Sequence, residues 1–585
     1  MTHFPRRTLS LLALPTLALP MLAMPLLLGA CATAQVAPPA AIAAPEERHA
    51  GLVSAADPRA AEAGATILYR GGNATDAAIA TMLALTVVEP QSSGIGGGGF
   101  LVRGAADGTV ETIDGRETAP RAAGPTWFLD PAGQPLPFMQ AVRSGLSVGV
   151  PGNLRLAEEA HRRHGKLPWA DLFAPAIALA RDGFYISPRL HEFLGEASDR
   201  AAASAEGRAL YFDAAGAPLP AGTLVRNPAL AATLERIARH GADAFYSGDN
   251  ARTVAAHVAA QTPHPQGMTE RDLAAYRAVP RAAVCGTYRA YRVCGMGPPS
   301  SGATTVFAIL KQLEQFDLRA LGSTSPVAWH LIAESMRLAY ADRELYLGDS
   351  DFVSVPVAGL TDPGYLAARG KLISPVDTMT QVQAGTPPGA KTALADGAGP
   401  PESGTSHFVA IDQDGTAVSY TSTIEGSFGS GIMAGGYYLN NELTDFSFTP
   451  DKQGKPVANR VEGGKRPRSS MAPTVIYGPD GKLFMAVGAA GGATIPAQVA
   501  RAVIGAIDWQ LTAQQALALP VLFAPGDTVF VERGSVLEAM IPSLRELGHT
   551  VEAKDMPLKA NAILLHGGTW TGAADPRSEG ATATP

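Results

Sequence analysis

Two threonines and a glutamate are expected to meet at one end of a β-hairpin. A Gln-Asp-Gly turn at 413–415 separates two β-prone runs. If its glycine takes the left-handed position of a three-residue loop, the register places Thr405 opposite Thr423, with Cβ atoms about 5 Å apart. Glu425 shares the face of Thr423, because side chains alternate along a strand. The pattern therefore brings two hydroxyls and a carboxylate together.

A threonine hydroxyl is a weak nucleophile unless a base removes its proton. The free α-amine of an N-terminal threonine is such a base, with a pKa of about 7.7–8.0. In an intact chain that nitrogen is an amide, so Thr405 would become active only after cleavage between Gly404 and Thr405. Gly404 leaves the carbonyl that must be attacked uncrowded. The alternative is that Thr405 is an ordinary strand residue.

Motifs along most of the chain resemble those of the γ-glutamyltranspeptidases, N-terminal nucleophile hydrolases that cut themselves to expose a threonine. The resemblance covers about residues 51–582, and Val409 departs from the Ser or Thr often found there. The stretches that carry it are 51–103 (with 71–78 and 96–100), 114–120 (Asp-Gly-Arg-Glu-Thr-Ala-Pro), 298–302, 405–407, 421–425, 428–429, 439–447, 466–471 and 572–578.

The resemblance implies an α+β fold, a four-layer αββα sandwich built jointly from two subunits of one precursor. Residues 51–404 would form the large subunit and 405–585 the small subunit. Periodicity alone indicates only mixed helices and strands. It predicts helices within 57–71, 73–88, 152–181, 325–343, 497–509 and 512–519, a hairpin within 474–487, close backbone packing at 96–99 and an exposed, mobile segment at 369–402.

The resemblance also assigns roles around a γ-glutamyl donor, which carries an α-carboxylate, an α-ammonium and a γ-amide. A guanidinium binds a carboxylate in a two-pronged way, and backbone N–H groups stabilise an oxyanion. The implied assignments are Arg116 with Ser469 and Ser470 for the carboxylate, Glu442 and Asp445 for the ammonium, Gly491 and Gly492 for the oxyanion, and Thr423 for orienting Thr405.

Glu425 departs from the family pattern, because well-known members have Asn at this position. An acid can also hold an ammonium group, so recognition of a γ-glutamyl group is still expected. However, Glu425, Glu442 and Asp445 would repel one another in one pocket unless a cation or a proton intervenes. The donor could therefore differ from glutathione.

Two alternatives remain beside the γ-glutamyl transferase and hydrolase. One is an amidase of the same fold for another acyl group, such as the glutaryl side chain of a β-lactam. The other is a non-catalytic envelope lipoprotein that keeps the fold as a binding module. Arg116 with three acids favours an amino-acid donor over a plain diacid, and intact Thr405 and Thr423 argue against a non-catalytic protein. The expected partners are a small γ-glutamyl donor and an amino acid, peptide or water acceptor.

Composition and the first 30 residues indicate an exported globular protein. The 585 residues are 46% hydrophobic and 17% charged, and the net charge of −7 gives no reason to expect nucleic acid or anionic membrane binding. Arg6 and Arg7 precede a long uncharged stretch typical of a signal peptide. Leu-Gly-Ala-Cys at 28–31 resembles a lipoprotein box, so residues 1–30 are predicted to be removed and Cys31 lipidated. The alternative is a plain signal peptide.

The predicted anchor would hold the protein at the periplasmic side of the envelope through lipid alone, with residues 31–50 as an Ala/Pro-rich tether.

Cys285 and Cys294 would face each other in a hairpin that turns at 289–290. A disulfide is expected in an exported protein, and two buried free thiols are the alternative. Two cysteines without a nearby histidine do not make a metal site. The implied mechanism uses no cofactor.

Overall fold

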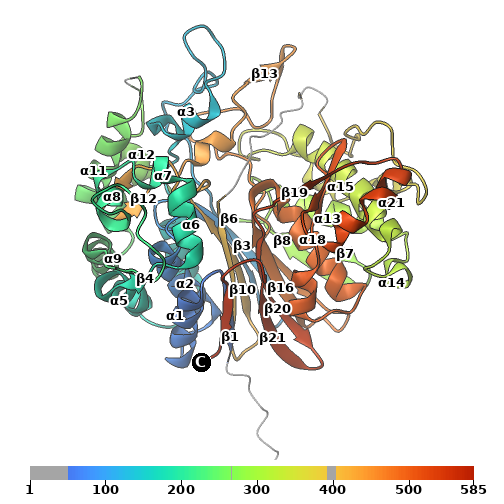
Figure 1. The fold of residues 1–585 in the computed structure, drawn as a ribbon, viewed down its shortest axis with the longest axis horizontal. Helices are drawn as coiled ribbons and strands as arrows, with labels where there is room; N and C mark the ends of the chain where they lie inside the picture. Colours follow the sequence, from blue (N-terminus) through green and yellow to red (C-terminus); the bar gives the residue numbers. More distant parts are fainter. Residues whose placement is uncertain (1–50, 265, 392–394, 396–403) are drawn as a thin grey trace, which may run out of the picture. The chain divides into compact units, whose positions relative to one another are not determined.

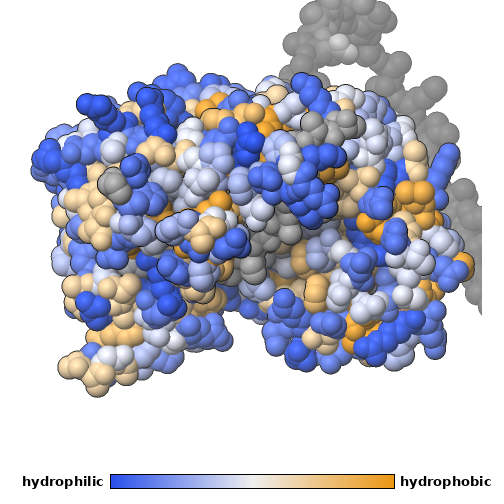
Figure 2. Space-filling view, turned by 90° about the horizontal axis from the view of Figure 1, so that it is seen from above, coloured by the Kyte–Doolittle hydropathy of each residue, from blue (hydrophilic) through white to orange (hydrophobic). Residues whose placement is uncertain are grey.

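A computed structural model describes residues 51–264, 266–391, 395 and 404–585. The predicted signal peptide, the tether with Cys31, and residues 396–403 before the cleavage site lie outside the described residues. Within the described part, no helix is both long and apolar enough to cross a membrane. Hydrophilic residues cover most of the face shown in Figure 2, and hydrophobic residues are scattered among them.

The predicted hairpin lies inside a seven-stranded sheet (Figure 1). Its strands β9 (Ser406–Ile411) and β10 (Ala417–Thr423) pair with Ser406 opposite Ser422, which confirms the predicted register. Strands from both sides of residue 404 are therefore interleaved in one sheet. The order is β22 (Ala581–Ala583), β1 (Leu52–Ala55), β9, β10, β2 (Gly98–Gly104), β3 (Val110–Gly115) and β6 (Val279–Arg281).

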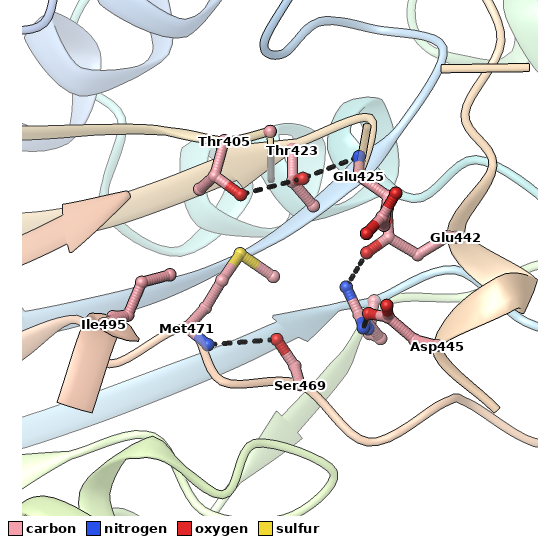
Figure 3. Close-up of a pocket in the computed structure, with 10 residues that line it drawn as sticks. Thr405, Thr423, Glu425, Glu442, Asp445, Ser469, Met471 and Ile495 are labelled. Carbon is pink, nitrogen blue, oxygen red and sulfur yellow. Dashed lines mark hydrogen bonds and ion pairs between the residues drawn. The ribbon is translucent and has the colours of Figure 1, made fainter. Parts of the chain in front are cut away.

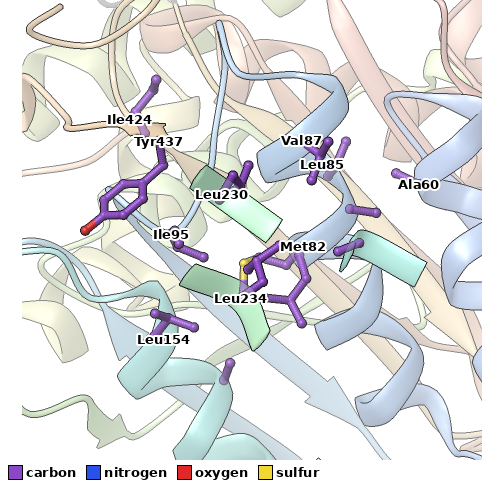
Figure 4. Close-up of a cluster of buried hydrophobic side chains, with 14 of the residues drawn as sticks. Ala60, Met82, Leu85, Val87, Ile95, Leu154, Leu230, Leu234, Ile424 and Tyr437 are labelled. Carbon is purple, nitrogen blue, oxygen red and sulfur yellow. The ribbon is translucent and has the colours of Figure 1, made fainter. Parts of the chain in front are cut away.

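Two helices with the predicted N-termini pack against this sheet. Asp57 caps α1 (Pro58–Tyr69), and a capping box of Asn73 and Asp76 begins α2 (Ala74–Val88). Every residue of α2 is buried, because β9 and β10 lie on one side of it and α5 (Ala174–Asp182) on another. Figure 4 shows the core that forms around Met82, Leu85 and Val87 of α2.

A second, six-stranded sheet packs against the other face of the first. Side chains of β9 point alternately to the two faces of the sheet and so enter two cores. Phe408 and Ala410 join the core around α2, whereas Val409 and Ile411 join the core of the second sheet. The order is β21 (Thr569–Ala574), β20 (Lys559–His566), β16 (Leu483–Ala490), β15 (Thr474–Tyr477), β8 (Tyr291–Gly295) and β7 (Val284–Tyr288).

Helices α13 (Gly302–Leu313), α15 (Pro326–Tyr346) and α18 (Ile495–Ile507) belong to the core of the second sheet and lie on its outer side in Figure 1. The mixed helix and strand content predicted from the sequence is confirmed. The predicted helix at 512–519 is α19 (Ala513–Ala518). The stretch 152–181 differs, because it forms α4 (Asn153–His164) and α5 with a break near Gly165 and Pro168, residues that interrupt helices.

The glycine run before β2 packs tightly against other backbone, as predicted. A Cβ placed on Gly97 would lie 1.9 Å from the carbonyl oxygen of Thr423, and one on Gly96 would lie 2.0 Å from that of Tyr438. Any side chain would push these strands apart. The run therefore sets the position of the strand end that carries Thr423.

Candidate functional site

Thr405 and Thr423 meet at the end of the hairpin, and both side chains are buried. The Thr405 hydroxyl donates to Thr423 Oγ1 over 3.1 Å, and the same oxygen accepts the backbone N–H of Glu425 over 2.8 Å (Figure 3). Both threonines lie on the hairpin face directed at the second sheet, since Ser419 on that face contacts Val487 of β16. The two hydroxyls thus form a short chain anchored on backbone.

The backbone around the predicted cleavage site is crowded and strained. A Cβ on Gly404 would lie 1.7 Å from the carbonyl oxygen of Glu425, so only glycine fits there. Thr405 has φ = 127°, a conformation that β-branched residues avoid and that costs about 1–3 kcal/mol. Cleavage would turn the Thr405 nitrogen into a freely rotating amine and would relieve this strain.

Glu425 is held by Asn441, a residue that the sequence analysis missed. Asn441 Nδ2 donates to Glu425 Oε2 over 2.5 Å, and Asn441 Oδ1 accepts the N–H of Gly426 over 2.8 Å. Glu425 has φ = 72°, which turns the chain sharply after Thr423. One amide side chain therefore fixes both the carboxylate and the turn that follows it.

Arg116 follows β3 and is almost completely buried. Its guanidinium forms ion pairs with Glu442 and Asp445, which lie on one turn of 3-10 helix (Glu442–Asp445), and it donates to the Arg468 carbonyl over 3.0 Å. Arg116 is thus in direct contact with the acids that the resemblance assigns to the opposite end of the donor. Its carboxylate partners and the donor carboxylate would share one guanidinium.

Glu117 is a second residue that the sequence analysis missed. It is fully buried, and neither carboxyl oxygen has a hydrogen-bond partner among the described residues. Burial raises the pKa of Glu117 to about 7, although Arg116 opposes the rise, and burial also raises the pKa of Glu442. Its position directly after Arg116 was the signal available in the sequence. A proton on one of these acids reduces the repulsion expected among the carboxylates.

Ten residues enclose a cavity of about 10 Å³, which is room for about one water molecule. Eight of them were predicted from the sequence, whereas Met471 and Ile495 were not. Ser470 instead accepts a hydrogen bond from Arg343 over 2.6 Å. The lining residues are Arg116, Gly404, Thr405, Thr423, Glu425, Glu442, Asp445, Ser469, Met471 and Ile495.

Gly491 and Gly492 follow β16 and precede α18, with φ of 123° and 59°. They do not line the cavity, but Ile495 at the start of α18 does. A Cβ on Gly491 would lie 2.3 Å from the Pro557 carbonyl oxygen. These backbone conformations and this close contact both require glycine.

A buried ion pair lies beside Ser406, the residue after Thr405. Lys559 Nζ lies 3.0 Å from Glu89 Oε2, and the same carboxylate accepts the Ser406 hydroxyl over 2.5 Å. Burial lowers the pKa of Lys559, and Glu89 opposes this effect. The network ties the residue after Thr405 to α2 and to β20.

Cys285 and Cys294 are paired across β7 and β8, with an S–S distance of 2.07 Å. The hairpin turns at Arg289, which has φ = 54°. The described residues contain no group of three or more His, Cys, Asp or Glu that could hold a metal ion.

Comparison with known proteins points to one family. The family described as gamma-glutamyltranspeptidase matches residues 60–584. The glutathione hydrolase proenzyme of Bacillus subtilis (strain 168) is 37% identical over 545 residues, 91% of either chain. That of Escherichia coli (strain K12) is 36% identical over 591 residues, 96% of this chain and 98% of the other. The crystal structure of cephalosporin acylase from Bacillus halodurans superimposes with a TM-score of 0.79 at 26% identity, over 92% of this chain and 96% of that one.

Proposed function

The chain belongs to the γ-glutamyltranspeptidase family, and we propose that it is a self-cleaving enzyme that moves γ-glutamyl groups from amides such as glutathione to water, amino acids or peptides. One observation carries the proposal. The Thr405 hydroxyl lies 3.1 Å from that of Thr423, directly after a position where only glycine fits. This is the arrangement that an N-terminal threonine nucleophile needs.

Self-cleavage exchanges one bond for another and then consumes water. Thr405 Oγ attacks the Gly404 carbonyl carbon, the C–N bond breaks, and the Thr405 nitrogen receives the hydroxyl proton. Water then hydrolyses the resulting ester, which leaves a Gly404 carboxylate and restores the Thr405 hydroxyl beside a free amine. The strained φ of Thr405 favours this direction.

The donor site is the set of charged groups around Arg116. We assign the donor carboxylate to Arg116, aided by Ser469 and Ser470, and the ammonium to Glu442 and Asp445. Four of these five line one cavity, and the buried Oε2 of Glu442 has no hydrogen-bond partner among the described residues. A donor ammonium would satisfy that oxygen. Glu425 lines the same cavity and is assigned to the same ammonium.

The cavity of the uncut chain is too small for an amino acid, so cleavage must also open it. Gly404 lines the cavity and lies so close to the Glu425 carbonyl that no Cβ fits between them. Once Gly404 is a free chain end it can withdraw, and the donor can enter. Cleavage would therefore create both the catalytic amine of Thr405 and the room that the donor needs in the cavity.

In turnover, the Thr405 amine takes the hydroxyl proton while Oγ attacks the donor γ-carbonyl. The N–H groups of Gly491 and Gly492 are assigned to the oxyanion, and Thr423 orients the nucleophile. The leaving amine takes the proton, and a γ-glutamyl ester of Thr405 remains. Water or an acceptor amine then opens the ester. No cofactor enters these steps.

The proposed precursor would yield a large chain ending at Gly404 and a small chain of residues 405–585, arranged as a four-layer αββα sandwich. Strands from both sides of residue 404 share each of the two sheets, which supports this arrangement. Separation would break those strand pairs, so the two chains should remain associated.

We further propose export to the envelope with lipid attachment at Cys31, based on the Leu-Gly-Ala-Cys sequence that ends the apolar leader. Mass spectrometry of the mature large chain should find a lipidated Cys31 at its N-terminus. An unmodified N-terminus in this region would refute the attachment.

Two measurements on matched variants test the function. Wild type and Thr416→Ala, a control in the hairpin turn, should give two chains on a denaturing gel and hydrolyse γ-glutamyl-p-nitroanilide. Thr405→Ala should remain one inactive chain. Wild type that stays uncut yet is fully active would refute the mechanism. Faster turnover of glutaryl-p-nitroanilide would favour the acylase alternative, and an uncut, inactive wild type would favour the binding protein.

A further inference from the structure

A large open hollow adjoins the nucleophile site. It has a volume of about 600 Å³ and is bounded by helices α6 (Pro188–Glu196) and α7 (Ser198–Ala201) with Arg200, by Ser427, and by the segment 555–558 before β20. None of these residues belongs to the donor site described above. The hollow is much larger than the cavity beside Thr405 and can accommodate a dipeptide.

Two contacts connect the hollow to the catalytic site. Glu425 lines the cavity beside Thr405 and Ser427 lines the hollow, so Gly426 lies in the wall between the cavity and the hollow. A Cβ on Gly426 would lie 2.9 Å from Arg200 Nη1. On the opposite wall, Pro557 lines the hollow and its carbonyl oxygen abuts Gly491. The hollow therefore flanks both the acid that follows Thr423 and the predicted oxyanion glycine.

Arg200 is the cation of the hollow that lies nearest this wall, and its charge is poorly neutralised. Its side chain is 15% exposed, and the nearest ion pair is with Asp199 at 3.9 Å. Its Nε has no hydrogen-bond partner in the described part of the chain. Burial lowers the pKa of the Arg200 guanidinium, and the charges of Asp199 and Glu425 oppose this effect.

Two other arginines of the hollow differ in this respect. Arg577 pairs with Glu532 at 2.8 Å, and the exposed Arg533 pairs with Asp555 at 3.2 Å. Glu192 and Glu196 also line the hollow, but both are exposed to solvent, which screens their charge. Arg189 also lines the hollow, and its Nε has no hydrogen-bond partner among the described residues either, but its guanidinium lies over the Phe193 ring, 5.0 Å from the ring centroid. An anion entering the hollow would therefore be drawn to Arg200 and Arg189, and of these two Arg200 lies beside Gly426.

We propose that this hollow binds the amino-acid or peptide part on the far side of the γ-glutamyl bond, with Arg200 holding its terminal carboxylate. The inference rests on the proposed function, because it requires a γ-glutamyl group on Thr405. The leaving group of a peptide donor and an amino-acid acceptor occupy the same side of the ester in turn. Both end in a carboxylate, which a guanidinium binds through two hydrogen bonds.

The test compares γ-glutamylglycine with γ-glutamylglycinamide, two donors that differ only in the terminal carboxylate of the leaving group. Glutamate release gives kcat/KM for each. Arg200→Met should lower kcat/KM for γ-glutamylglycine about tenfold or more and for the amide less than about threefold. Arg200→Lys should retain part of the preference. Arg162→Met, which removes an exposed arginine outside the hollow, should alter both values less than about twofold.

The outcomes separate this inference from the proposed function. If wild type hydrolyses neither donor nor γ-glutamyl-p-nitroanilide, the proposed function is wrong. The proposed binding of the leaving group or acceptor in the hollow is then wrong as well. If wild type is active but Arg200→Met leaves the ratio of the two kcat/KM values unchanged, the assignment of Arg200 alone is wrong. An equal loss on both donors also overturns that assignment, because it would show that Arg200 acts only by supporting Glu425.

Discussion

Replacing Thr423 by valine tests the hydroxyl pair at the centre of the site. Valine has nearly the shape of threonine but no oxygen. The change removes the acceptor of the Thr405 hydroxyl, at 3.1 Å, and of the buried Glu425 N–H, at 2.8 Å. Thr423→Ser keeps the oxygen and serves as the control.

The expected magnitude follows from these two contacts. A neutral hydrogen bond contributes about 0.5–1.5 kcal/mol, and a buried N–H left without an acceptor costs about 1–3 kcal/mol. The unpaired N–H of Glu425 destabilises the folded protein equally before the reaction and in the transition state, so it does not change the barrier. Only the contact with Thr405 acts on the proposed nucleophile, so a barrier increase of about 0.5–1.5 kcal/mol, or about 2–13-fold in rate, is expected.

The assay follows precursor cleavage on a denaturing gel over time and then the turnover of γ-glutamyl-p-nitroanilide by the cleaved fraction. Melting temperatures of both variants report the stability effect separately. Thr423→Val should be slow in both steps, whereas Thr423→Ser should stay close to wild type. If Thr423→Val cleaves and turns over within about twofold of wild type, Thr423 does not orient Thr405.

Two further predictions concern the charged pocket. Asp445→Asn should lower kcat/KM for γ-glutamyl anilides by an amount equal to about 2–5 kcal/mol of lost transition-state stabilisation. The loss should be much smaller for glutaryl anilides, because these lack the amine. Equal losses on both would show that Asp445 only supports Arg116. Burial raises the pKa of Glu117 from 4.5 to about 7, so the folded state binds this proton more tightly than the unfolded state, and stability should fall as pH rises from about 4.5 to 7. Glu117→Gln should flatten the decline of the melting temperature over that range, and an unchanged pH profile would contradict the buried, protonated carboxyl.

Local patterns were sufficient to predict the hairpin and the helix starts. The turn at 413–415 determines which residues face each other across β9 and β10, because pairing in a hairpin follows from the loop. Asn73 and Asp76 mark the start of α2 through hydrogen bonds within one turn of the chain. These features depend on neighbours in sequence, so the sequence contains them directly.

The predicted donor pocket is built from contacts between segments that are distant in the sequence. Arg116, Glu442 and Asp445 were predicted by motif to share a pocket, but their direct ion pairs were not predicted. The buried Glu117 beside them was not predicted either, since a Glu after an Arg is equally compatible with a surface position. Burial decides the protonation of these acids, and burial is a property of the packed molecule.

The amino-acid sequence by itself predicted the nucleophile and the cleavage site, and it determined the pairing of Thr405 with Thr423. Only the tertiary structure decided which groups surround that pair. Gly426 faces Arg200, and Gly491 faces the Pro557 carbonyl, from parts of the chain that no local pattern connects. The physical reason is that backbone hydrogen bonding in a hairpin is local, whereas charge and shape in a pocket arise where separate elements pack.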